Sequence, residues 1–200
     1  MAVLTQSEYL IISNKLKVSK LINKSPLTEE GDFIDILIGL HIILEVGLNS
    51  FFRQVSLLSI KKNIDRLEIM DNIDKVGFID KTILFIYNSK FDFGTEIEEA
   101  IKHHKIIGIL RNFAETRNKL LHGHAIATFH TEENRIPRLS RSRKILNLNF
   151  LQEQITRFRK ILAGMRFYLD HLDSPITESG KQDLAESYLD DSFIPEAVEL

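Results

Sequence analysis

Apolar residues recur along most of this chain at the three- and four-residue spacing that gathers them on one side of an α-helix. The clearest stripe lies in the last helix that the sequence predicts, which begins near Asn149 and Gln152. Its apolar residues are Leu151, Ile155, Phe158, Leu162, Met165, Leu169 and Leu172. A stripe of this kind is typical of antiparallel helix bundles, so we predict that this helix packs in the core.

Capping and helix-breaking residues predict the limits of the other helices. Thr5 and Glu8 have the spacing of a capping box, which begins a helix that runs to about Asn23. Ser25-Pro26 interrupts the pattern, because proline cannot continue a helix interior. Farther along, the periodicity predicts a long helix over 29–60, one or two short helices within 65–87, and another helix over 95–121.

Residues 124–148 interrupt the helical pattern. Gly123 takes the usual glycine position after a helix C-terminus, and the residues that follow are polar and turn-forming, with weak strand character in AIATFH. We expect a long loop or a small hairpin here, and long loops in compact domains are often functional. The fold class is therefore all-α: an antiparallel bundle of four to five helices, with this loop or hairpin before the last helix.

The pattern divides the chain into three parts. Residues 1–27 form an N-terminal helix and linker, and residues 28–173 form the main helical domain. Residues 174–200 are acidic and sparse in apolar side chains, so we expect them to form a flexible tail.

The composition limits the cellular compartment and the kinds of chemistry that we expect for this protein. The 200 residues include no cysteine, which excludes a disulfide framework, a thiolate nucleophile and a Cys-ligated zinc. The N-terminus lacks the pattern of a signal peptide. Asp35, His41 and Glu45 interrupt the most apolar stretch, whereas a membrane span needs about 20 uninterrupted apolar residues. We therefore expect a cytoplasmic protein without a membrane partner.

The net charge of −2 conceals two segments of opposite charge. Residues 135–166 contain nine Lys or Arg and one acid, Glu153, whereas residues 173–200 contain eight acids and one Lys. The basic segment is either a polyanion-binding face or a solvated helix face. The candidate contacts are loop arginines and arginines off the apolar stripe of the last helix: Arg138, Arg141, Arg143, Arg157, Arg159 and Arg166.

Arg117 stands out in the helix expected over 95–121, because it shares a stripe with Leu110 and Phe113. Arginine is rarely fully buried without a partner, so Arg117 needs a carboxylate or a cavity. His122 follows five residues later, about 7.5 Å along the axis and about 140° around it. The two side chains converge only if His122 leaves the helical path. A histidine side chain ordinarily changes its protonation near neutral pH, and the C-terminus of a helix stabilises its protonated form.

The helix expected over 29–60 carries one polar row in an otherwise apolar sequence. His41, Glu45 and Asn49 are spaced four residues apart. Burying such groups costs about a few kcal/mol unless they are hydrogen-bonded. The row is either a set of buried side chains whose polar groups are all hydrogen-bonded, or a set that supports a functional site. A glutamate facing Arg117 across the bundle would serve both interpretations, since a catalytic arginine needs a partner that orients it.

RNKLLH, residues 117–122, resembles the R-x4-H motif of HEPN domains, including the polar Asn118 after the arginine. LHIILEVGLNSFF, which carries Glu45 and Asn49, is also similar to that superfamily, and the resemblance covers roughly 28–173. It implies a HEPN-like four-helix bundle that dimerises and brings two motifs into one cleft. It also implies the metal-independent RNA cleavage of many members, which often act as toxins or antiviral effectors.

The sequence departs from some toxin members at one position. Those members carry a tyrosine two residues after the motif histidine, which a partner nucleotidyltransferase modifies. The residue here is His124, so we do not expect regulation by that route. A cognate regulator or antitoxin of another kind is still a candidate partner.

Cleaving RNA without a metal requires a base for the 2′-hydroxyl, an acid for the leaving 5′-oxygen, and positive charge for the phosphorane. His122 suits proton transfer at neutral pH, and the planar guanidinium of Arg117 suits the phosphorane oxygens. Asn118 would hydrogen-bond the phosphate or support the site. One histidine cannot easily be both base and acid, so we expect a homodimer with a composite site. The basic segment would bind the RNA backbone, and we expect no cofactor or metal.

Two other interpretations stay open. One is a metal site built from histidines, but no carboxylate lies at a recognisable ligand spacing from His103, His104, His122, His124 and His130. The other is a non-catalytic HEPN-like module that dimerises and binds RNA, nucleotide or a protein partner. In that case Arg117 would cap carbonyl groups or pair with Glu45.

Overall fold

The computed structural model of the chain describes residues 5–24, 30–59, 75–88, 97–121, 127–130, 138–141, 148–172 and 174–195. These residues form six helices and one two-stranded hairpin. The helices are α1 (Gln6–Ile22), α2 (Glu30–Ser59), α4 (Phe78–Asn88), α5 (Ile97–Leu121), α6 (Leu148–Asp170) and α7 (Glu178–Tyr188). The hairpin pairs β1 (Ala127–His130) with β2 (Arg138–Arg141) in antiparallel register. The predicted helical fold class is confirmed, and the hairpin occupies the segment predicted as a loop or hairpin.

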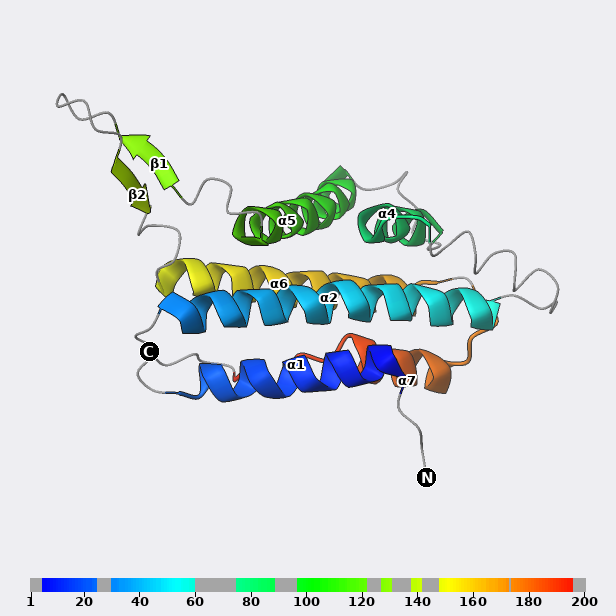
Figure 1. Cartoon of the computed structure of the whole chain (residues 1–200). Helices are drawn as coiled ribbons and strands as arrows, with labels where there is room; N and C mark the ends of the chain where they lie inside the picture. Colours follow the sequence, from blue (N-terminus) through cyan, green and yellow to red (C-terminus); the bar gives the residue numbers. More distant parts are fainter. Residues whose placement is uncertain are drawn as a thin grey trace.

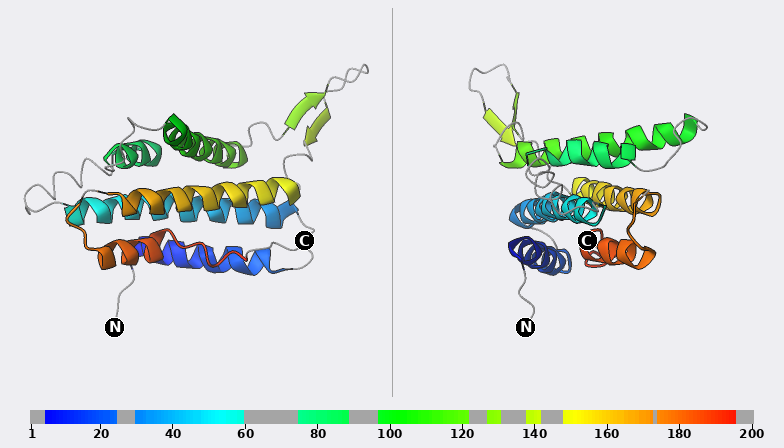
Figure 2. Two further views of the ribbon diagram at one scale, coloured as in Figure 1. Left: turned by 180° about the vertical axis from the view of Figure 1, so that it is seen from behind. Right: turned by 90° about the vertical axis from the view of Figure 1, so that its right-hand side faces the viewer.

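The helices are arranged in three layers (Figures 1 and 2). α2 and α6 lie side by side in the middle, α4 and α5 cover one face, and α1 and α7 cover the other. α1 runs antiparallel to α2, but α2 and α6 run in the same direction, and α5 crosses them at a steep angle. The predicted antiparallel bundle of four to five helices is therefore not the arrangement found, because the described residues form six helices and α2 and α6 are parallel. The chain crosses back over the middle layer through α5 and begins α6 at the end where α2 began (Figure 1).

The predicted capping box begins α1. The Thr5 hydroxyl accepts a hydrogen bond from the Glu8 amide at 3.3 Å, and the Glu8 carboxylate accepts one from the Thr5 amide at 2.7 Å. These bonds satisfy two amides that a helix start otherwise leaves unpaired. The bond from the Thr5 amide also holds the pKa of Glu8 below its ordinary value.

The hydrophobic core is centred on the middle layer. All the residues of the stripe predicted for α6 are buried, none more than 8% exposed. α2 matches them with Ile36, Leu37, Leu40, Ile43, Leu44 and Leu48. Because α2 has neighbours on both faces, its apolar residues extend nearly all round the helix.

α2 is also long and apolar enough, over Asp32–Leu58, to meet the length and composition of a membrane-spanning helix. Core helices of soluble proteins meet the same criterion, and 56% of its most apolar window is buried inside the fold.

Two glycines of the middle layer allow the outer layers to approach closely. A Cβ atom on Gly39 in α2 would lie 2.5 Å from Val18 Cγ2 in α1. A Cβ atom on Gly164 in α6 would lie 2.5 Å from Ile106 Cδ1 in α5. Real Cβ atoms essentially never come so close to another heavy atom. A larger residue at Gly39 would therefore force Val18 or its helix to shift, whereas at Gly164 the end of the flexible Ile106 side chain would have to move.

The C-terminal part of the chain is not the flexible tail that its composition predicted. α7 and the residues after it pack on the face that α1 leaves partly uncovered (Figure 2), and Ile176, Leu184, Leu189 and Ile194 are buried there. The prediction was wrong because a few well-spaced apolar side chains suffice to fill this remaining space. Residues 196–200 of the predicted tail lie outside the described residues.

Candidate functional site

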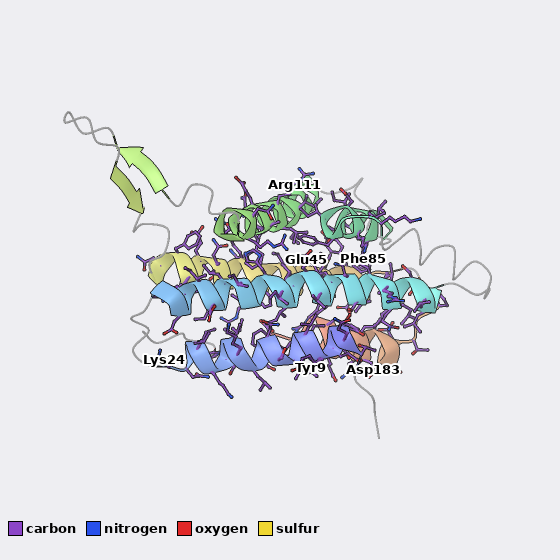
Figure 3. The ribbon with its side chains drawn as sticks, in the orientation of Figure 1. Tyr9, Lys24, Glu45, Phe85, Arg111 and Asp183 are labelled. Carbon is purple, nitrogen blue, oxygen red and sulfur yellow. The ribbon has the colours of Figure 1, made fainter. Side chains whose placement is uncertain are left out.

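The polar row of α2 lies between the middle layer and the layer formed by α4 and α5. Figure 3 shows Glu45 in the space between α2 and this outer layer, whereas Arg111 lies on the outer side of α5. Arg117 of α5 and Lys81 of α4 face the row from opposite ends. The site is thus built by three helices that are distant in the sequence.

The centre of the site is an ion pair between Arg117 and Glu45. Arg117 Nη2 lies 3.2 Å from Glu45 Oε2, so the glutamate expected to face Arg117 across the bundle does so. Arg117 Nη1 also donates a hydrogen bond to Asn118 Oδ1 at 3.2 Å. Both members of the ion pair are 37% exposed, and exposed pairs contribute only about 0–1 kcal/mol to stability. The main consequence of the pair is therefore to orient the guanidinium.

His41 lies one helical turn before Glu45 and is only 5% exposed. Its ring packs against Phe113 with the ring centres 3.9 Å apart. Burial lowers the pKa of His41 to about 3, and the positive charge of Arg117 acts in the same direction. The imidazole is consequently neutral at physiological pH. Its buried Nε2 has no hydrogen-bond partner among the described residues.

Asn49 ends the row, where it meets α4. Its Oδ1 accepts a hydrogen bond from Lys81 Nζ at 2.8 Å. Lys81 is only 8% exposed, which is rare for a lysine. Lys81 was not among the predicted site residues, although it is spaced three and four residues from the apolar residues Phe78 and Phe85. The position of Lys81 within this amphipathic stripe was the sequence signal that could have identified it as buried.

Two neighbouring hollows open beside these residues. The first has a volume of about 110 Å³ and is lined by the polar residues His41, Glu45, Arg117 and Asn118 and by apolar residues that include Phe78, Phe113 and Ala114. The second has a volume of about 480 Å³ and is lined by residues that include Glu45, Asn49, Lys75, Phe78 and Lys81. They share Glu45 and Phe78, so the hollows adjoin. We call the first the ring cavity and the second the lysine hollow.

Several predicted site residues cannot be placed beside this pair. His122 and Arg143 lie outside the described residues. The backbones of Arg138 and Arg141 lie in β2, and their side chains are outside the described part of the structure. The convergence of His122 on Arg117 is still a prediction.

The arginines of α6 do not form the free basic face that we expected. Arg159 Nη2 donates hydrogen bonds to the carbonyl groups of Ile194 and Pro195 at 3.0 and 2.7 Å. Arg166 donates to the carbonyl of Leu189 and lies 3.4 Å from a carboxylate oxygen of Asp191.

These contacts tie down the C-terminal segment on the face of the middle layer that lies opposite α5 (Figure 1). Arg159 and Arg166, which we expected to bind a polyanion, are thus paired with the acidic segment that is folded onto them. Arg157 pairs with Glu153 one turn earlier on the exposed side of α6.

Within the described parts of the chain, no three His, Asp or Glu side chains gather closely enough to hold a metal ion. Comparisons of the sequence with protein-family models and with curated proteins, and of the chain with solved structures, found no match.

Proposed function

We propose that this chain is a metal-independent endoribonuclease of the HEPN type, which cleaves RNA through its ribose 2′-hydroxyl. A cytoplasmic toxin or antiviral defence role fits such an activity. The observation that carries the proposal is the Glu45–Arg117 ion pair at the edge of the ring cavity. It orients a half-exposed guanidinium, and the motif RNKLLH places His122 five residues farther on.

In the proposed reaction the 2′-oxygen attacks phosphorus, the bond from phosphorus to O5′ breaks, and a 2′,3′-cyclic phosphate forms. Arg117 binds the charged phosphorane oxygens through its planar fork of donors. Asn118, hydrogen-bonded to Arg117, supports it. His122 transfers protons, and a homodimer supplies one such histidine as base and the other as acid. The proposed reaction takes its nucleophile from the RNA, and we propose that it uses no metal or cofactor.

The RNA strand would approach over the outer layer formed by α4 and α5, where the site lies. Arg138, Arg141 and Arg143 of the segment between α5 and α6 are the proposed backbone contacts, with Arg157 on the exposed side of α6. Contacts of this kind make affinity fall steeply with salt. A cognate regulator or antitoxin would act on this complex of the protein with RNA.

A non-catalytic HEPN-like module that binds RNA, nucleotide or a protein partner is the second candidate. The ion pair itself favours it, because Glu45 already satisfies part of the hydrogen-bonding capacity of Arg117. Both candidates use the same side chains, so only an activity measurement separates them.

The test is to incubate the purified full-length protein, in excess EDTA, with total tRNA and with a defined single-stranded RNA. We expect the wild type to cleave and to leave a 2′,3′-cyclic phosphate or its hydrolysis product. Arg117→Ala and His122→Ala should each lower the rate by about 10²–10⁴ while remaining folded. Arg111→Ala, on the outer side of the same helix, is the matched control and should cleave like the wild type.

Two results would reject the proposal. RNA binding without cleavage by the wild type would favour the non-catalytic module. Activity that is lost in EDTA and restored by magnesium or manganese would overturn the metal-independent mechanism.

A further inference from the structure

α1 carries a row of apolar side chains on its outer side. Tyr9, Ile12 and Leu16 are 63%, 45% and 58% exposed, and their spacing of three and four residues places them on one side of the helix. Ile11 and Val18, on the other side, are buried. Figure 3 shows Tyr9 on the side of α1 that faces away from α2. Single exposed apolar residues are common, but a contiguous row marks an interaction surface. We call these three residues the outer stripe.

The two ends of α1 carry opposite charges. Glu8 lies in the first turn and Lys20 in the last turn. Both hydrogen bonds that the Glu8 carboxylate accepts from Thr5 end on Oε2, so Oε1 has no such bond among the described residues. Lys20 is exposed and, unlike Lys17, forms no ion pair within the described part of the chain. Two copies of α1 that pack antiparallel would therefore place each acidic end beside a basic end.

The outer stripe is also symmetric about its own middle. Tyr9 and Leu16 lie equally far from the point between Ile12 and Ser13. A two-fold axis at that point would pack Ile12 of one copy against Ile12 of the other, and Tyr9 against Leu16. The same patch then meets itself, as in any two-fold dimer. Parallel packing would instead bring the two basic ends together, where like charges repel.

The charges beside the outer stripe disfavour a membrane or a nucleic acid as its occupant. α7 lies in the same outer layer as α1 (Figure 2) and presents the exposed acids Glu178, Asp183 and Glu186. Figure 3 shows Asp183 on the outer side of α7. An anionic lipid surface or a phosphate backbone attracts basic side chains and repels acidic ones. A second copy of the chain, which has both charges, fits this layer better.

We propose that two chains pair through their outer stripes, with the two α1 helices antiparallel. This contact is separate from the shared cleft of the proposed function, because α1 lies in the layer opposite α5, which carries Arg117 (Figure 1). A chain that uses both surfaces assembles beyond a dimer. One helix pair buries less than the roughly 1,600 Å² of a standard interface, so the dissociation constant should lie in the micromolar range.

The first test is the mass of the full-length protein in analytical ultracentrifugation, over a series of micromolar concentrations. Leu16→Glu places a charge in the contact and should raise the dissociation constant by at least about tenfold, the scale of a central interface residue. At high concentration the wild-type assembly should have twice the mass of this variant. Leu58→Glu, at a 48% exposed position near the end of α2, is the matched control and should keep the wild-type mass.

The second test uses single cysteines, because the chain has none of its own. Ser13→Cys lies beside the proposed two-fold axis, so mild oxidation should link two chains. A disulfide needs Cα atoms within about 7 Å of each other. Lys20→Cys is the control, since antiparallel packing would separate its two copies by about 22 Å along the helix axis. This test decides the matter even if Leu16→Glu does not fold.

Three results would overturn the proposal. The first is a folded Leu16→Glu variant with the wild-type mass at every concentration. The second is a disulfide that forms in Lys20→Cys and not in Ser13→Cys, which would mean parallel packing. The third is a monomeric wild type that binds vesicles of phosphatidylcholine and phosphatidylserine, which would assign the outer stripe to a membrane surface.

The outcome is separable from that of the proposed function. A twofold fall in mass in Leu16→Glu, in a protein that never cleaves RNA, would uphold the pairing through α1 and reject the nuclease. RNA cleavage by a wild type whose mass equals that of Leu16→Glu would uphold the nuclease and reject the pairing.

Discussion

The carboxylate of Glu45 lies 3.2 Å from the guanidinium of Arg117 and joins the middle layer of the fold to the outer layer. The pair lies between two hollows, because Glu45 lines both of them. A pair that is more than one-third exposed adds little to stability. We propose that the pair takes part in binding or chemistry, because its contribution to stability is too small to explain its position.

Replacing this carboxylate should slow the proposed reaction without unfolding the protein. In Glu45→Gln the side chain keeps its shape but loses the charge that orients Arg117. We expect kcat to fall about tenfold with little change in KM, because the guanidinium acts on the transition state more than on bound RNA. The free energy of unfolding should change by less than about 1 kcal/mol.

Glu153→Gln is the matched control, because Glu153 forms an ion pair with Arg157 on the exposed side of α6. It should leave kcat and KM unchanged. If Glu45 had only a structural role, its replacement would lower the folded fraction and leave kcat per folded molecule intact. That result would contradict the positioning role.

The neutral His41 makes stability depend on pH in a defined window. Its pKa is about 3 in the folded chain, lowered by burial and by Arg117, against about 6.5 when unfolded. The unfolded chain therefore binds more protons between these values, so stability is complete above about pH 6.5 and is lost as the pH falls toward 3. Between pH 7 and pH 5 we expect a loss of about 2 kcal/mol from this group.

The measurement is urea unfolding at several pH values between 7 and 5, where most carboxylates are still ionised. His41→Phe should remove most of the slope. His171→Phe, at an exposed position, is the control and should keep it. A wild-type curve that is flat in this window would mean that His41 is solvated or gains a partner in solution.

The parts of the fold that the sequence predicted are those that depend on local periodicity. The stripe of α6 and the capping box at Thr5 follow from residues a few positions apart, and both are found as predicted. The relationship of Glu45 to Arg117 was also predictable, since each is a charged residue on an apolar helix face and each needs a partner.

What the sequence did not predict depends on how distant segments pack. The common direction of α2 and α6 is a property of the whole chain path, and no local pattern encodes it (Figure 1). Lys81 belongs to a short helix whose limits were ambiguous, so its burial beside Asn49 was not expected. The contacts of Arg159 and Arg166 arise because the acidic segment folds back onto them.

Arg159 and Arg166 should therefore matter for stability and not for RNA affinity. Arg166→Ala removes a donor to the Leu189 carbonyl and a partner of Asp191, both part-buried, so we expect a loss of about 1–3 kcal/mol. Lys160→Ala, exposed on the same helix, should cost less than about 0.5 kcal/mol. RNA affinity and its salt dependence should be the same in both variants.

Thermal unfolding and RNA binding at two salt concentrations measure these effects. A folded Arg166→Ala variant with clearly weaker RNA binding would restore the polyanion role that the structure argues against. The loop arginines offer the contrast, since Arg141→Ala and Arg143→Ala should weaken binding and reduce its dependence on salt.

A homodimer with one shared cleft makes a prediction for mixtures of chains. The proposed reaction needs a proton acceptor and a proton donor, and His41 stays neutral because burial lowers its pKa to about 3. We therefore expect His122 of both chains to take part, so that only pairs of wild-type chains cleave RNA.

When wild type exchanges freely with a variant that carries both Arg117→Ala and His122→Ala, the initial rate should fall as the square of the wild-type fraction. Native mass spectrometry establishes that mixed dimers form. A linear dependence under those conditions would mean that each chain works alone, and it would remove the shared cleft while leaving the Glu45–Arg117 pair in place.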